Sequence, residues 1–246
     1  MKKYSLLSVA NEGYKDFLHI FLNSALENLN LEYIEEIRIL NTGVDDDIVK
    51  YYEEKNNKIK FIPYKNIIKT DKPWDKGWQQ NVELKTNFVK EYLSEYKIPV
   101  AMVDIDCMFI KDIQDIMDIE GDLSMCERQD IFFGSPVIAS FVGFINIEKS
   151  IDFINEWHKI IDSIDNPPKE TPALNQMVKE NTKYDLRGVT HKLVGLYAEG
   201  HIIPDTRIIH FKGGDINVPL SEVIKTRTVD RFPKFKEQIE KYKIWS

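Results

Sequence analysis

Two carboxylates stand two positions apart at the end of a short apolar segment of the chain. The segment 98–110 reads Ile-Pro-Val-Ala-Met-Val-Asp-Ile-Asp-Cys-Met-Phe-Ile and places the carboxylates at Asp104 and Asp106. In a β-strand, residues two apart point to the same side, so both carboxylates can face one point in space. Two anions held this close repel each other unless a cation lies between them or one is protonated. Because Mg²⁺ and Mn²⁺ prefer oxygen ligands and are often shared with phosphates, the spacing predicts a metal-dependent enzyme acting on a phosphorylated substrate.

The composition predicts a globular protein that does not bind nucleic acid. The chain has 246 residues, of which 43% are hydrophobic and 30% charged, and its net charge is −7. This length suits one substantial domain, and the acidic balance gives no electrostatic reason for nucleic-acid binding. The 2 cysteines cannot build a disulfide framework, so we expect a reducing cytoplasm.

The C-terminal tail is basic although the whole chain is acidic. Residues 225–246 hold seven Lys or Arg against three acids, with four aromatic residues between them. No apolar run approaches the ~18 residues that span a bilayer, so any membrane association is expected to be peripheral. Contact of this tail with an anionic membrane surface or a phosphorylated acceptor is one interpretation. An amphipathic terminal helix that packs its aromatic side chains on the domain is the interpretation we favour.

The first half of the chain alternates between strand-like and helix-like segments. Apolar spacing predicts strands at 4–9, 34–40, 59–63 and 100–104, and helices at 14–29 and 79–96. The Asp45-Asp46-Asp47 cluster is expected to cap a short helix rather than to bind a metal. This alternation predicts an α/β fold with a mostly parallel sheet, flanking helices, and ligands at the carboxyl ends of the strands. Two such ends are Asn11 and Asp104.

The second half is less regular and more mixed. Strands are predicted at 122–127, 137–147 and 207–211, and helices at 150–164 and from 171 to 179. Gly143 interrupts one strand, where the backbone is expected to bulge or to approach a ligand closely. We expect one domain, with a regular half at 1–106 and a more mixed half at 107–246.

Several segments together resemble the GT-A glycosyltransferases, the nucleotide-diphospho-sugar transferases with a Rossmann-like fold. The likeness rests on Ser8–Tyr14 as nucleotide loop, Lys85–Val89, Val103–Asp106 as metal motif, Val142–Asn146 and Asn175-Gln176. The resemblance implies nucleotide or phosphate contacts at Val9, Ala10, Asn11, Tyr14, Lys85, Asp104 and Ile105. It also implies catalytic or donor-sugar roles for Asp104, Asp106, Asn146 and Gln176.

The segment His210-Phe211-Lys212-Gly213 resembles the C-terminal segment of retaining members of that group. The resemblance implies that His210 completes a Mn²⁺ (or Mg²⁺) site with Asp104 and Asp106, and that Lys212 and Gly213 contact phosphate. Many members have a further Lys where this chain has Asp215, so Lys212 is expected to supply that charge. Loop tryptophans Trp74 and Trp78 are expected either to stack on a sugar or to anchor the loop.

The resemblance implies a nucleotide-binding half at 1–106 and a donor-sugar and acceptor half at 107–246. It further implies transfer of a sugar from a nucleoside diphosphate sugar to a glycan, lipid-linked or protein acceptor, with retention. If the reaction instead inverts, Asp185, Asp205 and Asp215 are the candidate bases. One alternative is a sugar-nucleotide pyrophosphorylase, although the Asn11–Tyr14 loop lacks the glycine-rich, basic character that holds a triphosphate. A phosphatase that uses the Asp pair and a non-catalytic nucleotide-binding module are the others.

Overall fold

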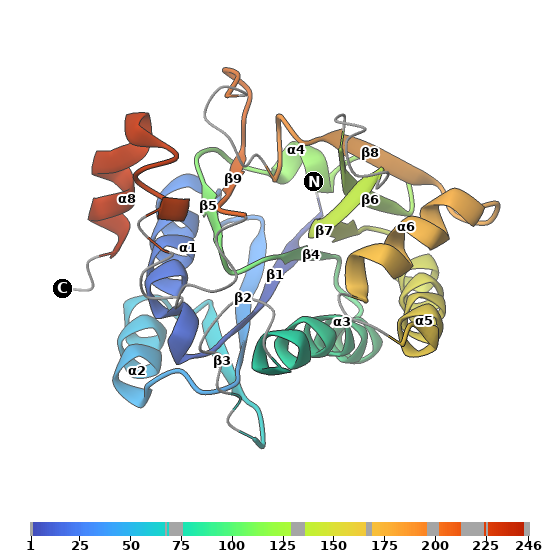
Figure 1. The fold of residues 1–246 in the computed structure, drawn as a ribbon, viewed down its shortest axis with the longest axis horizontal. Helices are drawn as coiled ribbons and strands as arrows, with labels where there is room; N and C mark the ends of the chain where they lie inside the picture. The colour runs from blue at the N-terminus through green and yellow to red at the C-terminus, as the bar shows by residue number, and fades with distance from the viewer. Residues whose placement is uncertain are drawn as a thin grey trace.

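The fold is built on a mixed sheet that the first half of the chain dominates (Figure 1). The structure is a computed structural model, and it describes residues 2–66, 68, 76–128, 136–165, 169–195, 202–212, 224 and 226–243. The sheet has seven strands within these ranges, in the order β3-β2-β1-β4-β7-β6-β8. They are β1 (Tyr4–Ala10), β2 (Ile34–Asn41), β3 (Ile59–Pro63), β4 (Val100–Val103), β6 (Leu123–Glu127), β7 (Val137–Phe144) and β8 (Leu186–Thr190).

Strand directions confirm the predicted α/β class and its mostly parallel sheet. Strands β3, β2, β1 and β4 run parallel to one another, and β6 and β8 are also parallel neighbours. Only β7 among the described strands of this sheet runs the opposite way, antiparallel to both β4 and β6. The carboxyl ends of β1 and β4 therefore meet at one edge, while the carboxyl end of β7 lies at the other edge.

Helices cover both faces of the sheet. The helical segments are η1 (Glu12–Tyr14), α1 (Lys15–Asn28), α2 (Asp46–Lys55), α3 (Lys76–Tyr96), α4 (Gln114–Met117), α5 (Ile147–Ser163), α6 (Glu170–Glu180), η4 (Pro233–Phe235) and α8 (Lys236–Lys243). In Figure 1, α1, α2 and α8 lie together on one side of the sheet, and α3, α5 and α6 lie on the other. Side chains of the first group belong to one hydrophobic core, and those of the second group belong to another. Strands that are buried on both sides need a hydrophobic core on each face of the sheet, and the two cores supply this.

Local chemistry explains where several helices begin. The Asp45 carboxylate accepts a hydrogen bond from the Asp47 amide at 2.8 Å, which confirms the predicted capping role of this acidic cluster. Helix α5 begins at Ile147 rather than at 150, because the Asn146 side chain caps it by accepting from the Lys149 amide.

Gly143 allows close approach of a neighbouring strand rather than of a ligand. A Cβ atom at this position would lie 2.3 Å from Ser124 Oγ and 3.1 Å from Met117 Sδ. The irregularity in the β6–β7 pairing falls instead between Met125 and Cys126. The expectation of a ligand or a bulge at Gly143 is therefore wrong.

A second, two-stranded sheet joins the middle of the chain to its C-terminal part. Strand β5 (Cys107–Phe109) pairs antiparallel with β9 (Ile208–His210), and Cys107 is the register partner of His210. This pairing carries His210 to the carboxyl end of β4.

The C-terminal tail packs on α1, as the favoured interpretation predicted. Phe232, Ile239 and Tyr242 are buried, and the Tyr242 hydroxyl accepts a hydrogen bond from Asn28 at 3.0 Å. Lys241 forms an exposed ion pair with Glu27. Among the described residues, no helix is both long and apolar enough to cross a bilayer.

Candidate metal and nucleotide site

The paired carboxylates lie in a turn and not in a strand. Strand β4 ends at Val103, and the turn Asp104-Ile105-Asp106 leads into β5. The strand geometry invoked for the pair is therefore wrong, although the predicted convergence of the two carboxylates on one point is found. The turn is held by the Asp104 amide, which donates to Ser140 O at 2.9 Å, and by Asp106 O, which accepts from the Phe211 amide at 2.8 Å.

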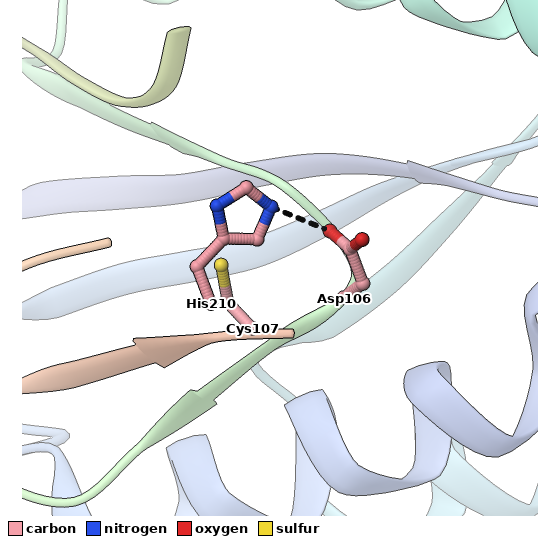
Figure 2. A group of neighbouring side chains, drawn as sticks. All are labelled: Asp106, Cys107 and His210. Atoms are coloured by element: carbon pink, nitrogen blue, oxygen red, sulfur yellow. Dashed lines mark ion pairs between the residues drawn. The ribbon is translucent and has the colours of Figure 1, made fainter. Parts of the chain in front are cut away.

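One oxygen of each carboxylate faces the same imidazole nitrogen. His210 Nε2 lies 3.2 Å from Asp106 Oδ1 and 3.6 Å from Asp104 Oδ2 (Figure 2 draws the contact with Asp106). The other oxygen of each carboxylate is bound by a cation: Asp104 Oδ1 by Lys85, and Asp106 Oδ2 by Arg227. We call the oxygens bound by Lys85 and Arg227 the outer oxygens, and the two that face His210 the inner oxygens. The two ion pairs hold the outer oxygens, so the inner oxygens point toward His210.

Burial and neighbouring charges shift the pKa values of these groups in opposite directions. Burial alone would raise the pKa of Asp106, but His210 and Arg227 outweigh burial and hold this pKa well below its usual range. Burial would likewise lower the pKa of Lys85, and the carboxylates of Asp104 and Glu170 instead raise it. Glu170 Oε1 lies 3.1 Å from Lys85 Nζ, and burial raises the pKa of Glu170 to about 7 despite the lysine.

Two of these residues were not expected from the sequence. Arg227 is buried and also donates from Nε to Phe211 O, so it connects the C-terminal segment to the carboxylate turn. Glu170 opens α6 and is buried against Lys85. An acid in the first turn of a helix and an arginine in a basic tail look like ordinary surface charges, so their sequence context gave no signal.

Cys107 lies beside the carboxylate and imidazole groups. Its sulfur, a carboxylate oxygen of Asp106 and a ring nitrogen of His210 all lie within 4.8 Å of one another, and all three residues are buried (Figure 2). Burial, followed by the negative charges of Asp106 and Asp104, raises the pKa of the Cys107 thiol well above its usual value. The thiol is therefore neutral unless a metal displaces its proton.

The donor atoms suit a hard divalent ion. Two carboxylate oxygens and one imidazole nitrogen converge from Asp104, Asp106 and His210, and this mixed O and N set matches the preference of Mn²⁺. Asp104 is the more accessible acid, with 28% of its side chain exposed. The predicted metal-binding residues thus fit the ion that the resemblance implies.

The predicted nucleotide-binding residues gather around this site. Val9 and Ala10 end β1 next to β4, Asn11 follows them, and the side-chain Nδ2 of Asn11 donates to Ile68 O at 3.0 Å. Tyr14 is buried, and burial and then the charge of Asp106 act to raise its pKa, while the charge of Arg227 opposes them. Burial raises this pKa above the usual value.

The basic side chain of Lys212 also belongs to this edge of the sheet. Burial lowers its pKa, while the charges of Asp104, Asp106 and Glu170 oppose this effect. Within the described ranges, Lys212 forms no ion pair with an acidic side chain. Ile105 is buried in the carboxylate turn.

Other predicted residues lie elsewhere. Asn146 follows the carboxyl end of β7, and Phe144 of that strand pairs with Val100, so Asn146 lies at the edge opposite Asp104. Asn146 therefore does not lie beside the carboxylate turn, and its side chain caps α5 instead. Gln176 is exposed on α6, while its neighbour Asn175 binds the backbone of Val137 with its side chain.

The remaining predicted residues have different outcomes. Asp185 precedes β8 at the same far edge as Asn146, where its amide donates to Asp122, so it is not a candidate base for this site. Asp205 is exposed in the turn before β9. Gly213, Asp215 and Trp74 lie outside the described residues, as does the side chain of Trp78.

Comparison with known proteins supports the fold assignment. No protein-family model and no curated protein matches the sequence. The structure of galactosyltransferase LgtC with donor and acceptor sugar analogues matches with a TM-score of 0.66 and 13% identity, over 98% of this chain and 97% of LgtC. Glycosyltransferase GlyE of Streptococcus pneumoniae matches with a TM-score of 0.65 and 14% identity, over 100% of this chain and 61% of GlyE.

A third match is the bifunctional glycosyltransferase WbbM, with a TM-score of 0.63, 10% identity, and coverage of 98% of this chain and 52% of WbbM. The chain thus spans less than two thirds of GlyE and about half of WbbM. Identities this low establish the fold alone. The chain has the GT-A glycosyltransferase fold, as the resemblance of its sequence segments implied.

Proposed function

We propose that the protein is a metal-dependent glycosyltransferase that moves a sugar from a nucleoside diphosphate sugar to an acceptor. The observation that carries the proposal is the convergence of the inner oxygens of Asp104 and Asp106 on His210 Nε2. This convergence lies at the carboxyl end of β4 beside the end of β1, where parallel α/β sheets bind nucleotides. A divalent ion held there would neutralise negative charge on a diphosphate leaving group.

The residues around the carboxylates have distinct tasks in this proposal. Lys85 and Arg227 fix the outer oxygens of Asp104 and Asp106, so these carboxylates keep their orientation during binding. Lys212 supplies a cation that is not bound to an acid of the described chain, and it is assigned to the diphosphate. Val9, Ala10, Asn11 and Tyr14 are assigned to the nucleoside.

Retention is proposed on the resemblance of the His210–Gly213 segment to that of retaining enzymes. In such a reaction the leaving phosphate can accept the proton of the acceptor, so no separate base is needed. Glu170 is a buried acid that contacts Lys85, the lysine that also binds Asp104 in the carboxylate turn. Its pKa of about 7 keeps part of its population protonated at neutral pH. It can therefore offer either a donor or an acceptor to a hydroxyl group.

The proposal is tested by a thermal-shift screen of nucleoside diphosphate sugars with and without Mn²⁺. A ligand at 100 times its Kd should stabilise the native state by about 2.7 kcal/mol. We expect a shift that needs both the donor and Mn²⁺, and that is lost in Asp104→Asn. Asp185→Asn, at the opposite edge of the sheet, is the matched control and should keep the shift.

Turnover then distinguishes the competing functions. Mass spectrometry with an acceptor panel should detect a glycosylated acceptor and a released nucleoside diphosphate. Formation of a sugar nucleotide from a nucleoside triphosphate and a sugar phosphate would instead indicate a pyrophosphorylase. Metal-dependent binding without transfer across the panel would indicate a binding module, and release of phosphate from simple esters would indicate a phosphatase.

A further inference from the structure

Three different ligand types meet at the start of the two-stranded sheet. Cys107 and His210 are register partners across β5 and β9, so their side chains lie next to each other, and Asp106 precedes Cys107. One ligand atom from each residue lies within 4.8 Å of the other two, and all three residues are buried (Figure 2). The set offers a sulfur, a nitrogen and an oxygen atom.

The sulfur of Cys107 has no hydrogen-bond partner among the described residues. In the part of the chain that the structure describes, this sulfur forms neither a hydrogen bond nor a disulfide, and the ring nitrogen of His210 that faces the carboxylates is Nε2. The other buried thiol differs, because Cys126 Sγ donates to Val194 O at 3.0 Å. The Cys107 sulfur is therefore available as a metal ligand once its proton is displaced.

The separation of the oxygen and nitrogen donors fits a small tetrahedral ion. Two ligand atoms that lie about 2.0–2.1 Å from a Zn²⁺ ion in tetrahedral geometry are roughly 3.3 Å apart. Asp106 Oδ1 and His210 Nε2 are 3.2 Å apart. A thiolate favours Zn²⁺ or Co²⁺ over Mn²⁺ and Mg²⁺, whereas the set that includes Asp104 in place of Cys107 favours the harder ions.

We propose that Asp106, Cys107 and His210 form a binding site for a thiophilic divalent ion such as Zn²⁺, in competition with Mn²⁺. Binding forms a metal–sulfur bond and releases the thiol proton to solvent, with no change of oxidation state. Water fills the fourth position. Ions enter from the side of Asp104, whose side chain is 28% exposed.

The two metals exclude each other because both sites need Asp106 and His210. Zinc bound through Cys107 leaves Asp104 without an imidazole partner and prevents the Mn²⁺ arrangement. Zinc therefore inhibits sugar transfer, and this consequence alone rests on the proposed function. Binding of zinc through the cysteine stands on the geometry of the three side chains.

The test uses Co²⁺ and Zn²⁺ on the full chain without nucleotide. Wild-type protein with Co²⁺ should show a sulfur-to-cobalt charge-transfer band in the near ultraviolet. Cys107→Ala should lose the band and weaken Zn²⁺ binding by more than about 100-fold, since even the loss of outer-shell partners costs roughly 10- to 100-fold. Cys126→Ala, which alters the other buried thiol, should keep both.

A measurement on the unaltered protein covers the case in which Cys107→Ala fails to fold. X-ray absorption at the zinc edge should show one sulfur at about 2.3 Å from the metal. A shell of nitrogen and oxygen alone, or a cobalt band that persists in folded Cys107→Ala, would overturn the site.

The competition has its own readout. In paramagnetic resonance, one equivalent of Zn²⁺ should release bound Mn²⁺ from the wild type, whereas Cys107→Ala should need a larger excess of Zn²⁺ for the same release. Simultaneous binding of both ions would overturn exclusion. Asp104→Asn should keep the cobalt band while it loses Mn²⁺ binding. Failure of nucleotide binding with a preserved cobalt band would refute the proposed function and leave this site intact.

Discussion

Arg227 should be one of the most sensitive positions for stability, because it compensates a buried carboxylate. The guanidinium binds Asp106 Oδ2, and the two side chains are only 6% and 12% exposed. It also donates to Phe211 O and lies 5.0 Å from the centre of the Phe17 ring. Arg227→Met keeps much of the apolar packing but leaves Asp106 without this partner. Breaking a buried pair in this way costs about 3–5 kcal/mol of unfolding free energy.

Urea unfolding of four proteins measures this coupling. The proteins are the wild type, Arg227→Met, Asp106→Asn and the double variant. The double variant should be less destabilised than the sum of the single changes, because each single change leaves a buried partner uncompensated. Arg187→Met is the matched control: Arg187 pairs with Asp185 at the surface, where the side chains are 50% and 52% exposed, so its loss should cost below about 1 kcal/mol.

One result would refute the reasoning. If Arg227→Met costs no more than Arg187→Met, or if the changes at 106 and 227 are additive, the buried ion pair does not stabilise the carboxylate turn. Arg227 would then contribute packing alone, and the assignment of the outer oxygen of Asp106 to a fixed cation would fail with it.

Two further predictions concern buried groups near the sheet. The pKa of Glu170 is raised from 4.5 to about 7. Between these two pH values the folded state holds a proton that the unfolded state has lost, so the stability of the fold falls as pH rises. Glu170→Gln should flatten thermal stability between pH 5 and 8, and an unchanged slope would argue against the raised pKa. Gly143→Ala should cost about 1–3 kcal/mol in urea unfolding, because its Cβ meets Ser124 Oγ. Ser124→Ala should recover part of this loss, and no recovery would exclude the steric cause.

The sequence was informative wherever local patterns decide the structure. Strand β3 has the predicted bounds, and the first two strands, their helices and the capping role of Asp45 were anticipated closely. Periodicity and capping act within a few residues, so they are visible in the chain itself. The same patterns placed Asp104 and Asp106 at the carboxyl end of a buried strand.

Strand direction was the main feature that local patterns could not supply. An apolar run predicts a strand, but it does not say which way the strand runs in a mixed sheet. Because β7 is antiparallel to β4, its end at Asn146 lies at the far edge from the carboxylates. For the same reason, the carboxyl end of β7 contributes no residue to the candidate site, although this strand was expected to border the donor sugar.

Contacts between residues that are far apart in the chain were the other feature that local patterns could not supply. Arg227 contacts Asp106 across 121 positions, and Glu170 reaches Lys85 from the start of α6. Each is an ordinary charged residue in its own segment, and only tertiary packing makes it a buried partner. The convergence of His210 with the carboxylates was anticipated through the resemblance of its segment, and the β5–β9 pairing supplies the physical cause.

Calorimetric titration of the protein with UDP and GDP, in Mn²⁺ and in excess chelator, tests the central claim most directly. The account predicts that at least one nucleoside diphosphate binds in Mn²⁺ and not in chelator. It also predicts that Asp104→Asn and His210→Ala lose this binding while Asp185→Asn keeps it. Equal binding in chelator, or unchanged Mn²⁺-dependent binding in folded Asp104→Asn, would contradict a metal and diphosphate site at Asp104, Asp106 and His210.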